Sequence, residues 1–512
     1  MTYREPAIPD HTPTLTSIGK DTLVYLPGRV VPAIMAFVTT AVLTRFVLSP
    51  EDFGRYDLTM RLVMFLTTTG VIWLTILLLR FYPRYASKEE GGAGADPFVF
   101  NSVVALLRWA GIGGSLVLLG LVWAAGPESL FGSYRGLLGV AALVFVGNSL
   151  MELGLATARA KGKPWAYSVA AASNAVFRLP LGILILWLSG TGVAGFLCGL
   201  GLASIVIALS LMGRDLVHPV PLSLTSGQKA LLKECLLYGL PILGTLILNF
   251  FLGNTDRYLL KYFRGDAMVG AYAAACQLIE QPISMVFQTL MVAVFPAVTA
   301  LYETRGREAT EDLLRQLTRQ FLLFCLPLCA MLAVLGHHVM FTLTGVEYRA
   351  AYLVAPWLVA AALVYGLSYY ASFGLHLAKR TRTLLAITVV SIAVNLVINR
   401  LTIGTYGYVG CGMARLAANA VLAGLLALAS RRHLRWSFPW ASLIRISFAS
   451  AVAGAAAFLL QRHMAPNLLA LAVLGCVFCA VFMMISATLS EVSFRQLFSM
   501  LQPRGKTDEG PR

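Results

Sequence analysis

The sequence is built from apolar blocks of roughly 20 to 25 residues, and short polar links separate one block from the next. A helix of that length crosses about 30 Å of hydrocarbon. Because lipid offers the backbone no hydrogen-bond partner, only helices and closed barrels span a membrane, and barrel strands alternate polar and apolar residues over about 10 positions. The blocks here are continuous, so they predict an all-α polytopic membrane protein.

The composition supports the same class. Of the 512 residues, 58% are hydrophobic and 12% are charged, and the mean hydropathy is +0.75. A soluble chain carries about 25% charged residues. The net charge of +16 would suit nucleic acid, but the 40 Lys and Arg residues are spread along the chain. That distribution is typical of membrane orientation signals, and no nucleic-acid partner is expected.

The blocks and the turn signals between them indicate about 14 membrane spans. The spans are expected near residues 22–48, 57–80, 98–124, 135–158, 165–188, 191–213, 236–262, 267–298, 319–343, 351–376, 383–400, 407–430, 441–461 and 466–489. Because this number is even, both ends of the chain lie on the same side of the membrane.

Basic residues gather in every second link between spans. These links hold Arg84, Lys88, Arg159, Lys161, Lys163, Arg214, Lys229, Lys233, Arg305, Arg307, Arg315, Arg319, Lys379, Arg380, Arg382, Arg431, Arg432 and Arg435. The alternate links hold about a third as many bases, and basic links stay in the cytoplasm. Both termini are therefore expected to be cytoplasmic, including the polar segment 1–21, which shows no signal-peptide pattern.

No link is long enough to hold a catalytic domain, so the chain is not expected to be an enzyme. The longest links, 214–235 and 299–318, have patterns typical of amphipathic helices on the membrane surface. Cys476 and Cys479 form a CxxC pair, but no second pair and no nearby histidine accompany it. We expect no metal site and no cofactor.

The two halves of the sequence resemble each other. Gly54, Arg55 and Tyr56 open the second span, and Gly270, Ala271 and Tyr272 open the eighth. This predicts two pseudo-symmetric six-helix lobes, followed by two extra helices. The N-lobe is expected at 22–213, a cytoplasmic linker at 214–235, the C-lobe at 236–430, spans 13 and 14 within 431–489, and a cytoplasmic tail at 490–512.

Two stretches resemble the bacterial polysaccharide flippases of the multidrug/oligosaccharidyl-lipid/polysaccharide superfamily, which includes O-antigen and exopolysaccharide transporters. They are LTRFVLSPEDFGRYDLTMRLV at 43–63 and NTDRYLLKYFRGDAMVGAYAAACQLIEQP at 254–282. The resemblance implies a bacterial inner-membrane protein whose two lobes alternate between inward and outward access. It also implies that the last two helices form a hydrophobic groove for lipid.

Charged residues at membrane depth are candidates for function, because burying a charge there costs a few kcal/mol or more. The basic ones are Arg29, Arg45, Arg61, Arg108, Arg178, Arg257, Lys261, Arg415 and Arg445, and the acidic ones are Asp57, Glu152, Asp256 and Glu280. The excess of bases suits an anionic cargo, since guanidinium groups bind phosphate oxygens in pairs.

The first candidates for binding a pyrophosphate are Arg61, Arg45, Arg257 and Lys261. For the last three, the alternative is a helix-end position at the outer interface. Arg108 and Arg178 either line the cavity or are neutralised by Glu152 or Glu280.

Glu280 pairs with an arginine of the facing lobe or couples transport to H⁺ or Na⁺, and pairing is favoured because bases are plentiful. Asp256 and Glu152 are candidates for the same two roles, and for Asp256 the slightly favoured alternative is a carboxylate at a helix end.

The resulting hypothesis is a flippase for a polyprenyl-pyrophosphate-linked oligosaccharide, the repeat unit of a polysaccharide. Its partners would be that lipid-linked saccharide, membrane lipids and a polysaccharide polymerase or export machinery. A flippase for the peptidoglycan precursor and a cation-coupled drug or metabolite antiporter of the same superfamily are the alternatives. The antiporter is disfavoured because the first span contains no carboxylate.

Overall fold

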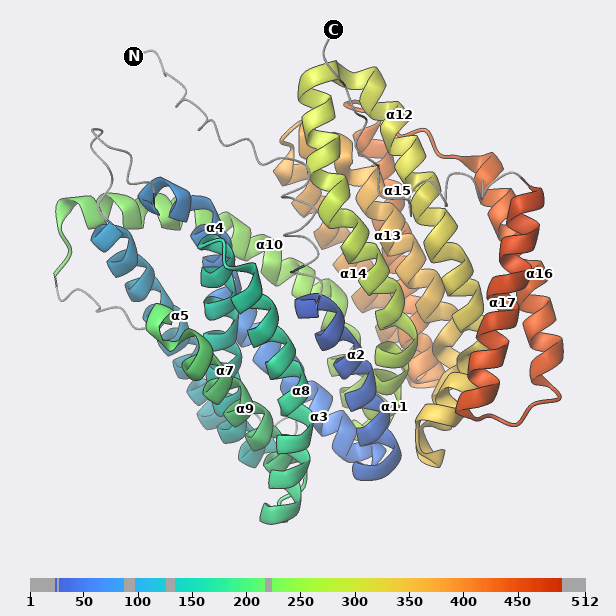
Figure 1. Ribbon diagram of the computed structural model, residues 1–512, viewed down its shortest axis with the longest axis horizontal. Coiled ribbons are helices and arrows are strands. Elements are labelled where there is room, and N and C mark those ends of the chain that lie inside the picture. Colours follow the sequence, from blue (N-terminus) through green and yellow to red (C-terminus); the bar gives the residue numbers. More distant parts are fainter. Residues whose placement is uncertain (1–23, 25–26, 87–96, 126–133, 217–222, 490–512) are drawn as a thin grey trace, which may run out of the picture. The chain divides into compact units, whose positions relative to one another are not determined.

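The structure is a computed structural model that describes residues 24, 27–86, 97–125, 134–216 and 223–489. The predicted segment 1–21 and the predicted tail 490–512 lie outside the described residues. Within the described part, all regular secondary structure is helical, as Figure 1 shows. The predicted all-α class is confirmed.

The chain divides into two compact units. Unit 1 comprises Met1–Thr39 and Arg55–Phe250, and unit 2 comprises Thr40–Gly54 and Phe251–Arg512. The division differs from the predicted lobes, because the end of the first span and the start of the second pack with the second half of the chain. The Thr44 carbonyl accepts a hydrogen bond from the Gly345 N–H (3.0 Å), and the Leu48 carbonyl accepts one from the Tyr348 hydroxyl (2.9 Å).

The helices of the first half begin with α2 and continue to α9. They are α2 (Pro27–Val42), the π-helical turn η1 (Leu43–Val47), α3 (Pro50–Thr67), η2 (Thr68–Ile72), α4 (Trp73–Ala86), α5 (Pro97–Ala125), α7 (Arg135–Ala160), α8 (Pro164–Ser189) and α9 (Val193–Leu216). In unit 1, α9 packs extensively against both α7 and α8.

The second half begins with α10. Its elements are α10 (Ser226–Arg264), α11 (Asp266–Ala275), η4 (Cys276–Glu280), α12 (Gln281–Leu343), η5 (Val346–Val354), α13 (Ala355–Leu377), α14 (Thr381–Tyr406), α15 (Tyr408–Ser430), α16 (Trp440–Gln461) and α17 (Leu468–Thr488). In unit 2, α15 packs extensively against both α13 and α14. The fourth, fifth and sixth spans therefore repeat as the tenth, eleventh and twelfth, as expected of duplicated halves.

Thirteen helical runs in the described residues are long and apolar enough to cross a membrane. One of them, Asp266–Leu343, is 78 residues long. Its α12 portion breaks at Gly306, and at about 1.5 Å per residue the helix on each side of the break is long enough for one span. Counting this run twice agrees with the predicted number of about 14.

The link predicted at 299–318 is part of α12 rather than a separate surface helix. Gly306 is the point at which α12 breaks, with φ 75° and ψ −160°, values that a residue without a Cβ adopts easily. Charged residues crowd this section on both sides of the break, from Glu303 to Arg319. The polar link thus consists of two helical stretches that meet at the break at Gly306, and it joins two membrane spans. Similarly, residues 226–235 of the predicted linker are the first turns of α10, and 217–222 are not described.

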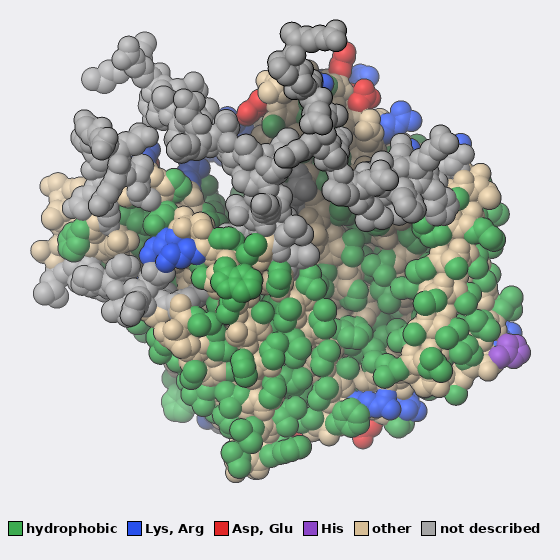
Figure 2. Space-filling view, in the orientation of Figure 1, with side chains coloured by type: hydrophobic (Ala, Val, Ile, Leu, Met, Phe, Trp, Pro, Cys, Tyr) green, Lys and Arg blue, Asp and Glu red, His purple; other side chains and the backbone are tan. Residues whose placement is uncertain are grey.

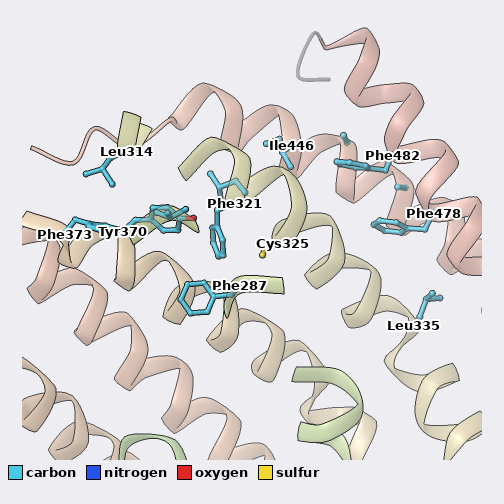
Figure 3. Packing of buried hydrophobic residues seen from close by; sticks show 14 of the residues in the cluster. Phe287, Leu314, Phe321, Cys325, Leu335, Tyr370, Phe373, Ile446, Phe478 and Phe482 are labelled. Carbon is cyan, nitrogen blue, oxygen red and sulfur yellow. The ribbon is translucent and has the colours of Figure 1, made fainter. Parts of the chain in front are cut away.

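The two extra helices belong to unit 2. The helices α16 and α17 pack against each other and against α12. Figure 3 shows the shared core, in which Phe321 and Cys325 of α12 lie near Ile446 of α16, with Phe478 and Phe482 of α17 beyond. Ala449, Ala453 and Ala457 are also buried there, at the i, i+4 and i+8 positions of one α16 face. Small residues allow close helix packing in lipid.

Hydrophobic side chains cover most of the helix length on the face seen in Figure 2, and the visible Lys, Arg, Asp and Glu side chains lie toward helix ends. Large apolar residues such as Trp187, Leu188 and Leu401 are more than 70% exposed. In water such exposure would be unfavourable, but lipid is the expected neighbour of a spanning helix.

Two repeated glycines meet within unit 2. A Cβ placed on Gly54 of α3 would lie 2.0 Å from the Asp266 carbonyl oxygen, and one on Gly270 of α11 would lie 1.9 Å from the Pro50 carbonyl oxygen. Each glycine thus faces the backbone four residues before the other glycine. The reciprocal contact brings together the two motifs that revealed the duplication.

Candidate functional site

A buried network of charges lies within unit 2, and we call Asp256, Arg257, Tyr272, Glu280 and Arg415 the Arg415 network. Arg415 of α15 is 8% exposed. Its Nη2 donates to Asp256 Oδ2 at 2.6 Å and to the Gly253 carbonyl at 3.1 Å, and its Nη1 donates to the Glu280 carboxylate. One guanidinium therefore joins α10, η4 and α15.

Asp256 has further donors. The Tyr272 hydroxyl donates to Oδ2 at 2.6 Å, and the Arg257 backbone N–H donates to Oδ1 at 2.9 Å. The Arg257 Nη1 atom lies 3.6 Å from Oδ1. The two carboxylates and two guanidinium groups of the network balance in charge. Such balance is required of buried ions, because an unpaired charge is strongly destabilising.

Lys261 lies one turn beyond Arg257 on α10 and pairs with Asp266, with Nζ 3.3 Å from Oδ1. Arg257 and Lys261 were predicted to bind the cargo, and the structure places both beside carboxylates of their own unit. Glu280 was predicted to pair with an arginine of the facing lobe. Glu280 does pair with an arginine, but the predicted location of that arginine was wrong, because Arg415 belongs to the same unit as Glu280. The sequence places Arg415 among the basic residues at membrane depth, but nothing in the sequence marked it as a partner of Asp256 and Glu280.

A second group of charges lies within unit 1. Arg61 of α3 forms an ion pair with Asp57 one turn earlier, with Nη2 3.0 Å from Oδ1. Arg178 of α8 is close enough to the Tyr56 phenol to interact with it electrostatically. Its Nε and Nη2 groups are buried and have no hydrogen-bond acceptor among the described residues. This arginine therefore has unused donors.

Arg108 of α5 is also short of acceptors. It is 4% exposed, and its Nε and Nη2 groups have no hydrogen-bond acceptor in the part of the chain that the structure describes. Its Cζ atom lies 5.4 Å from the centre of the Trp109 ring, which is a favourable cation–π distance. The alternative of neutralisation by Glu152 or Glu280 is wrong for the described residues, since neither carboxylate pairs with Arg108 or Arg178.

The remaining candidates lie apart from these groups. Glu152 of α7 is half-buried and interacts electrostatically with Arg159 on the same helix. Arg45 is exposed in η1 and lines a cavity of unit 2. Across the described residues, no three His, Cys, Asp or Glu side chains lie close enough to hold a metal ion.

The sequence matches two family models. Residues 18–301 match the model described as polysaccharide biosynthesis protein, and residues 191–478 match the model described as lipid II flippase MurJ. Each match spans more than half of the chain. No curated protein sequence matches. The matched families are flippase and transporter families rather than enzyme families.

Solved structures agree on the fold. The chain is similar to a lipid II flippase MurJ in an inward closed conformation, with 15% identity and a TM-score of 0.73 over 93% of this chain and 100% of that chain. It is also similar to an outward-facing MATE-family multidrug resistance transporter, with 17% identity and a TM-score of 0.52 over 81% and 94% of the chains.

A third similar structure is a superfamily transporter from Pyrococcus furiosus described as having a binding pocket of reverse polarity. The identity is 15% and the TM-score is 0.54, over 81% of this chain and 94% of that chain. The repeated helix pairs agree with the two family matches. This chain belongs to the polysaccharide biosynthesis and lipid II flippase families of the multidrug/oligosaccharidyl-lipid/polysaccharide transporter superfamily.

Proposed function

We propose that this protein flips a polyprenyl-pyrophosphate-linked oligosaccharide, the repeat unit of a polysaccharide, across the bacterial inner membrane. The observation that carries the proposal is the pair of arginines, Arg108 and Arg178, whose buried donors have no acceptor among the described residues. Both lie in the region matched by the polysaccharide biosynthesis model. Unmet cationic donors at membrane depth suit a cargo that brings its own phosphate oxygens.

The bases divide into two roles in this proposal. Arg108 and Arg178 bind the pyrophosphate, with Arg61 contributing its charge beside Asp57. Arg257, Lys261 and Arg415 already have carboxylate partners, so they hold helices of unit 2 in place. Transport then proceeds by alternating access of the two predicted lobes, with Arg108 and Arg178 binding the head group while the lipid tail stays in the bilayer.

The orientation, coupling and partners form part of the same proposal. Both termini are cytoplasmic, and a polysaccharide polymerase or export machinery receives the flipped unit. No cofactor is required. If an ion drives transport, Glu152 is the candidate for binding H⁺ or Na⁺, because it pairs with no cation in the described residues and lies on a spanning helix.

A second candidate cargo is the peptidoglycan precursor lipid. It is favoured by the match of residues 191–478 to the lipid II flippase model. Both cargoes present a pyrophosphate on a polyprenyl chain, so the same arginines would serve either one. The drug antiporter has only fold similarity in its favour.

The test is flipping in proteoliposomes of two fluorescent cargoes, a polyprenyl-pyrophosphate oligosaccharide and the peptidoglycan precursor. Arg108→Ala and Arg178→Ala should each reduce flipping at least about tenfold, because a charge-assisted hydrogen bond contributes about 1.5 to 3 kcal/mol. Arg178→Lys should keep part of the activity, since lysine retains the charge but not the bidentate geometry. Arg462→Ala, an exposed cation between α16 and α17, is the matched control.

Transport of the precursor without the oligosaccharide would assign the second cargo. Export of a cationic dye down a proton or sodium gradient, with neither lipid moved, would refute both flippase proposals.

A further inference from the structure

A cavity of about 460 Å³ lies at one end of unit 2, apart from the charges described above. It is lined by Ala41, Val42, Arg45, Phe46, Thr342, Leu343, Pro466, Asn467 and Leu468. Its wall therefore combines the end of the first span, the end of α12 and the start of α17. Its size falls within the range of small-molecule sites in proteins, roughly 300 to 1,000 Å³.

The cavity is lined by a cation that has no ionic partner in the part of the chain that the structure describes. No carboxylate among the described residues pairs with Arg45, and its Cζ atom lies 5.7 Å from the centre of the Phe46 ring. The Arg45 side chain is exposed at the edge of the cavity. A guanidinium in this position can bind an anion by two parallel hydrogen bonds.

Thr342 is the second observation that indicates a ligand. The residue is 5% exposed and lines the cavity, and its hydroxyl is buried without a hydrogen-bond partner among the described residues. Threonine in a helix commonly donates to a carbonyl one turn earlier, as Thr344 does to Met340 at 2.6 Å. An unsatisfied buried hydroxyl is unfavourable, and a ligand oxygen would give it a hydrogen-bond partner.

The start of α17 adds a third donor group. The Asn467 side chain caps this helix by accepting from the Ala470 N–H at 2.7 Å. The N-terminus of a helix carries a partial positive charge and free N–H groups, and it favours anions. Val42, Phe46, Leu343 and Leu468 make the rest of the wall apolar. The site therefore matches a molecule with a small anionic head and a hydrocarbon chain.

We propose that this cavity binds the phosphate group of an anionic membrane phospholipid, with its acyl chain against the apolar wall. The lining contains one cationic side chain among the described residues, which matches the single charge of a phosphodiester better than the higher charge of a pyrophosphate. In the predicted orientation, the three contributing segments lie at the outer surface. The site would hold α17 against the first span and α12 through a bound lipid.

The experiment is native mass spectrometry of the purified full-length protein titrated with phosphatidylglycerol or with phosphatidylcholine. Wild type should bind phosphatidylglycerol about tenfold more tightly than phosphatidylcholine. Arg45→Ala should remove this preference, Arg45→Lys should keep part of it, and Thr342→Val should weaken binding about threefold, as expected for one lost hydrogen bond. Arg462→Ala removes a cation from the same connection and should change nothing.

Three outcomes would overturn the proposal. Equal affinity for the two lipids would show that the site does not favour a net anionic head group over a zwitterionic one. Equal losses in Arg45→Ala and Arg462→Ala would indicate a general surface charge effect. Displacement of phosphatidylglycerol by inorganic phosphate alone would make the cavity a free-anion site. The assay contains no lipid-linked saccharide, so its result is independent of the flipping assay.

Discussion

Arg415 is the residue on which the charge balance of unit 2 depends. It bonds to both Asp256 and Glu280, which come from different elements. Without it, Glu280 would lose its ion pair with Arg415, and Asp256 would keep its pair with Arg257. Buried pairs are weak evidence of stability when intact, yet removing one partner is costly because the other charge remains.

Arg415→Ala should therefore lower the free energy of unfolding by about 3 to 5 kcal/mol, which thermal unfolding followed by tryptophan fluorescence would detect. Arg462→Ala is the exposed control and should leave the transition unchanged. Combining Arg415→Met with Glu280→Gln removes one charge of each sign, leaves Asp256 paired with Arg257, and should recover most of the stability. An Arg415→Ala protein as stable as wild type would contradict the structural role of this network.

At the scale of helices, the crossing of α3 and α11 depends on glycine at two positions. The backbones approach so closely that a Cβ on either Gly54 or Gly270 would overlap a carbonyl oxygen. Neither glycine has a positive φ, so the requirement is space rather than backbone conformation. Glycine at such contacts is typical of helices that pack closely in lipid.

Gly270→Ala should destabilise the protein by about 1 to 3 kcal/mol or prevent its accumulation in the membrane, because the helices must separate. Gly424→Ala is the matched control: this glycine lies within α15, and a Cβ added to it would have no neighbouring atom within 4 Å. There, alanine should be neutral or stabilising by about 0.5 to 1 kcal/mol. The measurement is the midpoint of thermal unfolding of the purified variants, and equal effects at both positions would contradict the close crossing.

At the scale of the whole molecule, the two halves share a helix arrangement but differ in how their buried basic residues are paired. In unit 2 the bases Arg257, Lys261 and Arg415 lie beside carboxylates. In unit 1, Arg108 and Arg178 have donors with no acceptor among the described residues. Duplication therefore preserved helix packing, while the charges diverged: the Arg415 network of unit 2 is balanced, whereas Arg108 and Arg178 of unit 1 are not.

The predicted orientation places the link after α13 inside and the connection between α16 and α17 outside. On a background without native cysteines, Arg380→Cys should react with a membrane-impermeant maleimide only after the inner membrane is opened, and Arg462→Cys should react in intact spheroplasts. Both side chains are exposed, so burial does not limit the reaction. The reverse pattern would place the termini outside.

The sequence by itself determined the class, the number of spans and the duplication. The length and continuity of the apolar blocks determine the class and the number of spans, because a bilayer has a fixed thickness and requires satisfied backbone hydrogen bonds. The motifs at Gly54 and Gly270 also identified the superfamily. The sequence could not reveal that the polar link is helical on both sides of a single break at Gly306, because local charge does not exclude a helix.

Only the tertiary structure decided which charges meet. Asp256 and Arg415 are separated by more than 150 residues in the chain, and no local pattern encodes their contact. Arg61, Arg257 and Lys261 look alike in sequence, as bases near span ends, yet each has a carboxylate beside it in space, whereas Arg108 and Arg178 do not. Charge pairing in a membrane protein depends on how helices distant in sequence pack, since a buried ion needs its partner within a few ångströms.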